Sequence, residues 1–108
     1  MRVYISGAIS GTKDYYQRFA DAEVEIKARG DEPVNPVKMM RGLEHLEYRD
    51  MITIDKRFID LSDALYMLNG WESSNGANIE HSYAVAAGKR ITYQPEVKDE
   101  SDQTERDT

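Results

Sequence analysis

Hydrophobic residues along this chain form short continuous runs that alternate with stretches of helical spacing. The runs at residues 2–6, 32–36, 64–68 and 91–93 are brief and end at or close to Gly, Pro or Asn, which is typical of strands. Apolar positions recur every three or four residues from Tyr15 to Gly30, over 47–62 and over 77–87, which predicts three helices. Thr12 or Ser10 is expected to cap the first helix. Residues 37–46 show no clear period, and we expect loop with some helix there.

This order of elements predicts an α/β domain with a parallel sheet and helices on both of its faces. The run at 64–68 is apolar throughout, as expected of a central strand that is buried on both sides. In such sheets, ligands bind beyond the carboxyl ends of the strands, where the strand order reverses. The segments that follow strands are 7–12, 35–46 and 69–76, so candidate site residues are expected there.

Composition and charge narrow the classes of function. The chain has 108 residues, of which 40% are hydrophobic, it has no Cys, and its net charge is −6. We expect one domain over 1–95 and an acidic disordered tail over 96–108, which holds few apolar residues. Disulfides and thiolate chemistry are excluded, and no apolar run is long enough to span a bilayer. No basic stripe is present to bind a nucleic-acid duplex. A cytoplasmic location without membrane association is expected.

Small residues dominate two of the loops that follow strands. Gly7, Ser10 and Gly11 lie in the first, but they form neither a G-x-G-x-x-G fingerprint nor a phosphate loop with Lys. One interpretation is a tight turn from strand to helix. The other is a pocket wall, whose amides and Ser10 hydroxyl face a sugar or a phosphate.

Glu80 is the strongest candidate for catalysis. It lies about one turn into the third predicted helix, where the N-terminal dipole favours an ionised carboxylate. Ala77, Ala84 and Ala87 share its helical face, which indicates close packing on the sheet. Burying a carboxylate in that face is costly unless it is paired or used. The alternative is a surface Glu that stabilises the helix dipole.

Four other residues are weaker candidates. His45 and His81 are expected at the surface, and their spacing does not suggest a metal site. Asp63 directly precedes the buried strand and stands out from the other acidic residues. Trp71 is either a core or lid residue, or an aromatic that stacks on a base.

Several segments, in order, resemble one known family. The matching segments are Tyr4–Gly11, Asn35-Pro36, Ser62–Ala64 and Trp71–Glu80, followed by Ala84 and Gly88. Together they resemble the nucleoside 2-deoxyribosyltransferase superfamily, in particular its short bacterial and phage branch, and the related 2′-deoxynucleoside 5′-monophosphate N-glycosidases. The resemblance covers about residues 1–93. It implies a flavodoxin-like (Rossmann-like) three-layer sandwich with about four or five strands.

The resemblance also implies a function and a set of site residues. Glu80 would attack the anomeric carbon, Tyr4 would orient it, and Asp63 would protonate or orient the base, giving an N-glycosidase or a deoxyribosyltransferase. The substrate would be a nucleotide or a nucleoside, with neither cofactor nor metal, in a homodimer or higher homo-oligomer. The substrate-binding positions would be Gly7, Ser10, Gly11, Asn35, Trp71, Ser74 and Gly76.

Ser74 bears on the choice between nucleotide and nucleoside. The resemblance implies that Ser at this position binds a 5′-phosphate, whereas Asp would repel it. Ser74 and Ser10, with the amides of Gly7 and Gly11, therefore favour a monophosphate. Against this, the N-glycosidases usually carry Arg in the first loop, where this chain has Ser10. A non-catalytic module that senses nucleotides is the alternative function.

Overall fold

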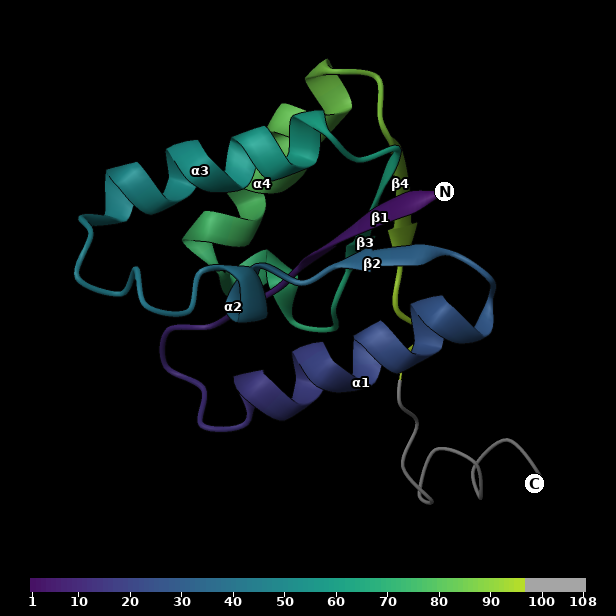
Figure 1. Ribbon diagram of the computed structural model, residues 1–108, viewed down its shortest axis with the longest axis horizontal. Coiled ribbons are helices and arrows are strands. Elements are labelled where there is room, and N and C mark those ends of the chain that lie inside the picture. Colours follow the sequence, from purple (N-terminus) through teal and green to yellow (C-terminus); the bar gives the residue numbers. More distant parts are fainter. Residues whose placement is uncertain (97–108) are drawn as a thin grey trace, which may run out of the picture.

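The computed structural model describes residues 1–96, in which strands and helices alternate along the chain (Figure 1). The elements in chain order are β1 (Arg2–Ser6), α1 (Tyr15–Ala28), β2 (Glu32–Val34), α2 (Pro36–Met39), α3 (Tyr48–Asp60), β3 (Ala64–Met67), the 3₁₀ helix η1 (Trp71–Ser73), α4 (Asn75–Ala86) and β4 (Arg90–Tyr93). The predicted strands and the three predicted helices are present, with ends that differ by up to two residues.

The four strands form one parallel sheet in the order β2-β1-β3-β4. Tyr4 of β1 pairs with Val34 on one side and with Leu65 on the other, so β1 lies inside the sheet. This is the flavodoxin-like order for four strands, and its switch point lies between β1 and β3. The predicted α/β class and parallel sheet are confirmed.

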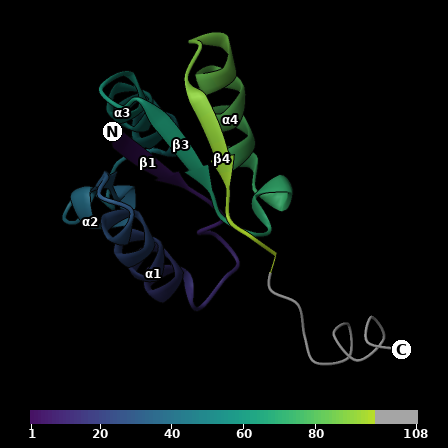
Figure 2. The same cartoon turned by 90° about the vertical axis from the view of Figure 1, so that its right-hand side faces the viewer.

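Helices cover both faces of the sheet, with α1 on one side and α3 and α4 on the other (Figure 2). Each face has its own hydrophobic cluster. Because side chains alternate along a strand, Val3 and Ile5 pack toward α1, whereas Tyr4 packs toward α3 and α4. Ser6 follows the same alternation as Tyr4. The strand β3 is buried along its whole length, as its apolar run predicts.

Two helix starts differ from the predictions. The helix α1 has Asp14 at its N-cap, and the Thr12 hydroxyl donates to the Ile9 carbonyl, so neither Thr12 nor Ser10 caps it. Pro36 begins α2 instead of only ending a strand. The Asn35 side chain caps α2 by accepting hydrogen bonds from two backbone amides of its first turn.

Three further expectations concern the helix faces and the chain end. Ala77 and Ala84 are buried in α4 as expected, but Ala87 is exposed because the helix ends before it. Within residues 1–96, every helix is too short or too polar to cross a membrane. Apart from Glu96, the expected acidic tail lies outside the described residues.

Candidate active site

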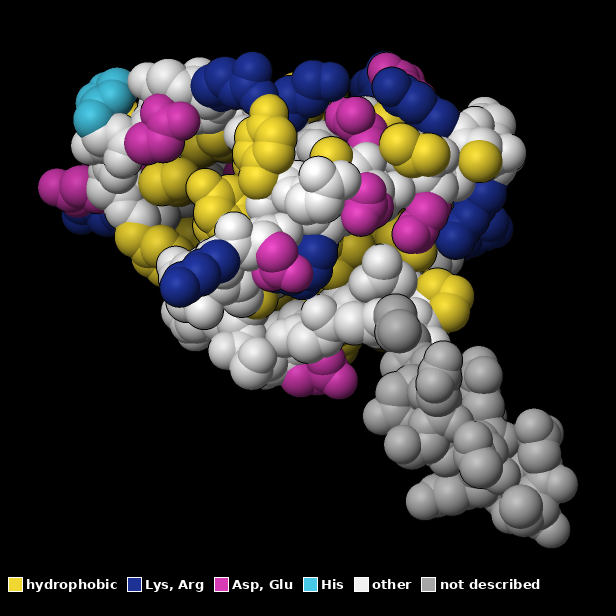
Figure 3. All heavy atoms as spheres, turned by 90° about the horizontal axis from the view of Figure 1, so that it is seen from below, with side chains coloured by type: hydrophobic (Ala, Val, Ile, Leu, Met, Phe, Trp, Pro, Cys, Tyr) yellow, Lys and Arg dark blue, Asp and Glu magenta, His cyan; other side chains and the backbone are white. Residues whose placement is uncertain are grey.

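A cavity of about 320 Å³ opens at the carboxyl end of β1, beside the switch point of the sheet. It is enclosed by the loop after β1, by α3 and by the first turn of α4. The predicted site residues that line it are Tyr4, Gly7, Ser10, Ser74, Gly76 and Glu80. Its volume is at the lower end of the range of about 300–1,000 Å³ that is usual for small-molecule sites. Hydrophobic side chains gather at the end of the molecule that carries α2 and the loop before α3 (Figure 3).

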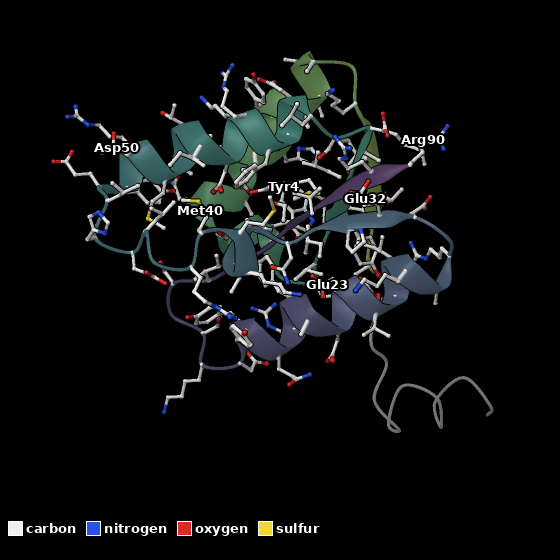
Figure 4. All side chains as sticks on the ribbon, viewed as in Figure 1. Tyr4, Glu23, Glu32, Met40, Asp50 and Arg90 are labelled. Atoms are coloured by element: carbon white, nitrogen blue, oxygen red, sulfur yellow. The ribbon has the colours of Figure 1, made fainter. Side chains whose placement is uncertain are left out.

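Glu80 lies inside this cavity and is held by two hydroxyl groups. The Tyr4 hydroxyl donates to Glu80 Oε2 at 2.8 Å, and Ser6 Oγ donates to Glu80 Oε1 at 2.7 Å. Because side chains alternate along β1, both donors lie on the face that α4 covers. Figure 4 shows Tyr4 in the interior, between the strands and the helices α3 and α4. The carboxyl group is therefore fixed at both oxygens, and Glu80 is only 6% exposed.

Asp55 is a second carboxyl group in the same cavity, and the sequence hypothesis missed it. It projects from α3 into the cavity, close enough for its charge to raise the pKa of Glu80. Burial raises the pKa of Asp55 above its usual value. Its Oδ1 atom is buried and has no hydrogen-bond partner among residues 1–96. Such an atom is free to act on a ligand.

Burial is the main cause that raises the pKa of Glu80, to about 8, and the neighbouring Asp55 charge adds to it. The hydrogen bonds from Ser6 and Tyr4 act in the opposite direction, since they stabilise the carboxylate. The expectation that the helix dipole keeps Glu80 ionised is thus outweighed by burial. Because the two carboxyl groups are coupled, the pair titrates as a unit that keeps one proton to higher pH than an ordinary carboxyl.

Tyr4 remains a neutral donor in this arrangement. Burial raises the pKa of its hydroxyl well above the usual value, and the charges of Glu80 and Asp55 raise it further. A phenolate beside two carboxyl groups would be strongly disfavoured. The Tyr4 hydroxyl therefore stays protonated and holds Glu80 in place by its hydrogen bond.

The first turn of α4 forms one wall of the cavity. Ser74 is the N-cap residue, and its Oγ accepts a hydrogen bond of 3.2 Å from the Ala77 amide. Gly76 lies against the Tyr48 side chain, since a Cβ atom at position 76 would be 3.2 Å from the Tyr48 hydroxyl. Tyr48 begins α3 and also lines the cavity, so α3 and α4 meet at its rim.

Asp63 does not lie near Glu80. Its carboxylate accepts a hydrogen bond of 2.8 Å from the Arg2 backbone amide at the amino end of the sheet, where Figure 4 shows Glu32 and Arg90. A residue that directly precedes a parallel strand is at that end, whereas the cavity is at the opposite one. Asp55 carried a usable signal, since it lies between Met51 and Ile59 at four-residue spacing on the apolar face of the helix.

Three other predicted residues also lie outside the cavity. Trp71 lines a separate, wider depression of about 810 Å³, and its ring stacks on His81 with centroids 4.5 Å apart. Asn35 is buried and used as the α2 cap, and Gly11 lies in an exposed turn. His45 is exposed as expected, whereas His81 is half-buried. In the described part of the chain, no group of three His, Asp or Glu side chains is arranged to hold a metal ion.

Comparisons with known proteins identify a family and solved structures of similar fold. A model of the family described as "Domain of unknown function (DUF4406)" matches residues 1–93. The structure of the CMP N-glycosidase BcmB from Clostridium botulinum superposes with a TM-score of 0.61 at 22% sequence identity. The superposition covers 86% of this chain and 67% of that one, and it agrees with the predicted flavodoxin-like fold. No curated protein matches the sequence.

Proposed function

The chain belongs to the DUF4406 family, and from this premise we propose that it cleaves or exchanges the N-glycosidic bond of a nucleoside or nucleoside 5′-monophosphate. The observation that carries the proposal is the buried Glu80 carboxyl, held by Tyr4 and Ser6 and paired with Asp55 in a cavity at the end of β1. The fold shared with a CMP N-glycosidase supports the same class of reaction.

In the first step, a Glu80 carboxylate oxygen bonds to the anomeric carbon as the bond from that carbon to the base nitrogen breaks. The departing base takes the bonding electron pair and a proton. Asp55 supplies that proton, because the pair holds one proton between two carboxyl groups. The reactive form of the pair has its proton on Asp55 and its charge on Glu80, and the hydrogen bonds that Tyr4 and Ser6 donate to Glu80 stabilise that form.

In the second step, water or another base attacks the anomeric carbon and releases Glu80 as a carboxylate. Asp55, now ionised, takes the proton of the attacking group and returns to its starting form. Water gives hydrolysis, and a second base gives transfer. Tyr4 and Ser6 keep Glu80 in one orientation through both steps, which supports attack along a fixed line.

The remaining walls suit a base and a sugar. Ile9, Met51 and Ile52 supply apolar surface, and the Tyr48 ring lies at the rim. Hydroxyl groups at Ser10 and Ser74 provide polar contacts for the sugar or its substituent at the 5′ position. Few polar groups within a mostly apolar cavity are typical of small-molecule sites.

A non-catalytic nucleotide sensor is the second candidate, and one observation favours it. Because its pKa is raised to about 8, Glu80 is itself protonated at neutral pH, and a protonated carboxyl does not attack carbon. In that form the cavity binds its ligand without turning it over. Binding without base release separates this function from the first.

The test is chromatographic detection of base released from each deoxynucleoside and each deoxynucleoside 5′-monophosphate. We expect the wild type to release base and Glu80→Ala to lose nearly all activity. Glu72→Ala is the matched control, because Glu72 is an exposed carboxylate near the start of α4 that does not line the cavity. Circular dichroism confirms that both variants fold. Wild type without base release on any substrate contradicts the proposal, and binding of those substrates would then identify a sensor.

A further inference from the structure

We infer that the Glu80 cavity accepts an uncharged nucleoside in preference to its 5′-monophosphate. The inference rests on the proposed function and narrows its substrate class. It follows from the charges of the cavity lining, from the existing contacts of Arg18 and Arg41 and from the contacts at the first turn of α4.

The charged side chains that line the cavity are all acidic. They are Asp55 and Glu80, and no Lys, Arg or His joins them from elsewhere in residues 1–96. With one of its two carboxyl groups protonated, the pair still carries a negative charge at neutral pH. A phosphate monoester adds a charge of about −1.5 to −2 at that pH. Placing the two in one cavity without a cation is repulsive.

Two arginines from segments beside the cavity are already engaged. Arg18 donates to the Ala8 carbonyl at 2.8 Å and forms an ion pair with Asp14, so it supports the first loop and lines the other depression. Arg41 donates to the Tyr16 hydroxyl on the surface. Because Arg18 contacts the loop backbone, turning it toward a phosphate would release the carbonyl that it now holds.

Tyr48 restricts access to the amides of the first turn of α4. Its hydroxyl accepts a hydrogen bond of 3.3 Å from the Asn75 side chain and lies against Gly76. A phosphate that uses helix N-terminal amides needs its oxygens beside the backbone at this turn. The Tyr48 hydroxyl occupies part of that approach, whereas a sugar hydroxyl needs only a single hydrogen bond.

Ser74 is compatible with either substrate, although the family resemblance implies that it binds a 5′-phosphate. Its oxygen already accepts from the Ala77 amide, which leaves its own proton to donate. One donated hydrogen bond satisfies a 5′-hydroxyl oxygen but offsets little of a phosphate dianion. Ser10 at the mouth is likewise an uncharged hydroxyl. The choice between the two substrates therefore depends on the net charge of the whole cavity, which favours the nucleoside.

The experiment compares kcat/KM for base release from each deoxynucleoside with that from its own 5′-monophosphate. For the base that is accepted, we expect the wild type to favour the nucleoside by roughly tenfold or more. Ser10→Arg places a cation at the mouth and should shift the ratio toward the monophosphate by roughly tenfold. Ser10→Gln, of similar length but neutral, should not produce the shift toward the monophosphate that Ser10→Arg produces. High salt should weaken the Ser10→Arg shift.

The outcomes keep this inference separate from the proposed function. Equal activity on the two substrates, or a preference for the monophosphate, overturns the substrate class while supporting N-glycosidic cleavage. If no base is released, the proposed function fails, and thermal shifts of the wild type with the same compounds decide the class. Stabilisation by nucleosides but not by monophosphates supports the inference. Stabilisation by neither, or mainly by monophosphates, overturns it.

Discussion

Asp55 and Glu80 reach one cavity from two adjacent helices, and the charge of Asp55 adds to the burial that raises the pKa of Glu80. Glu80 has a hydrogen-bond donor at each oxygen, whereas Asp55 Oδ1 has none among the described residues. Two similar groups in unlike surroundings are a recurrent way to divide the roles of nucleophile and acid. This asymmetry gives the pair a distinct pH dependence.

Asp55→Asn should reduce kcat/KM for base release by roughly 100-fold to 10,000-fold, since the leaving base loses its proton donor. The pKa of Glu80 should also fall, because the neighbouring charge that raises it is removed. Wild-type activity should decline above about pH 8, where the pair loses its proton. In the variant that alkaline decline should disappear. Base release measured from pH 5 to pH 10 tests both effects.

Asp63→Asn is the control for this prediction. Asp63 lies at the opposite end of the sheet and contacts the Arg2 amide, so its substitution should leave the pH profile unchanged. A large loss of activity in folded Asp63→Asn, with Asp55→Asn fully active, would restore the role that the sequence favoured for Asp63.

Ser6→Ala should shift the pH profile to higher pH and lower kcat by roughly tenfold. Ser6 Oγ donates to Glu80 Oε1, and this hydrogen bond lowers the pKa of Glu80, so its loss raises that pKa further. Fewer molecules then carry an ionised Glu80 at a given pH. The kcat profile of the variant, compared with wild type, measures the shift.

Ser62→Ala is a matched substitution away from the cavity. Ser62 is equally buried and donates to the Phe58 carbonyl. Both variants should lose about 1 kcal/mol of unfolding free energy. If Ser62→Ala moves the pH profile as far as Ser6→Ala does, the effect is general destabilisation and not a contact with Glu80.

Glu80 should make the protein less stable as the pH rises. Its pKa increases from 4.5 to about 8 on folding, so between these values the folded protein binds more protons than the unfolded chain. The free energy of unfolding should therefore fall through this interval and level off above about pH 8. Glu80→Gln removes that dependence, and the free energy of unfolding of the variant should exceed that of wild type by up to a few kcal/mol at pH 8 and above.

Urea unfolding of wild type and Glu80→Gln at several pH values from 4 to 9 measures this effect. The difference between the two proteins is the relevant quantity, because groups other than Glu80 and its neighbour Asp55 titrate equally in both. A difference that stays constant over this interval would mean that Glu80 has an ordinary pKa in the folded protein.

The sequence predicted what depends on periodicity. The alternation of strand-like runs with stretches of helical spacing predicted the parallel sheet. The small residues of α4 correctly indicated that Ala77 and Ala84 are buried. Glu80 was expected on the same face and is buried there. These features follow from local sequence, because each element must bury its apolar side.

Features that depend on packing between distant segments were not predictable in the same way. Asp55 and Glu80 are 25 positions apart, and only the packing of α3 beside α4 brings them together. The hydroxyl of Ser6 was overlooked because a buried Ser in a strand has no sequence signal of its own. Asp63 was favoured because it adjoins the buried strand, but a residue directly before a parallel strand lies at the amino end of the sheet, opposite the cavity.

Trp71 provides a final contrast between packing and substrate binding. Its ring stacks on His81 and packs against the cluster under α4, outside the Glu80 cavity. Trp71→Leu should therefore lower the unfolding free energy by about 1–3 kcal/mol, since a half-buried aromatic loses contacts. Its kcat/KM for base release should stay within roughly threefold of wild type. Tyr48→Leu should lower kcat/KM for base release and leave the unfolding free energy nearly unchanged, because Tyr48 is exposed and lines the cavity. A stable Trp71→Leu variant whose KM rises strongly would instead support the stacking role that the sequence suggested.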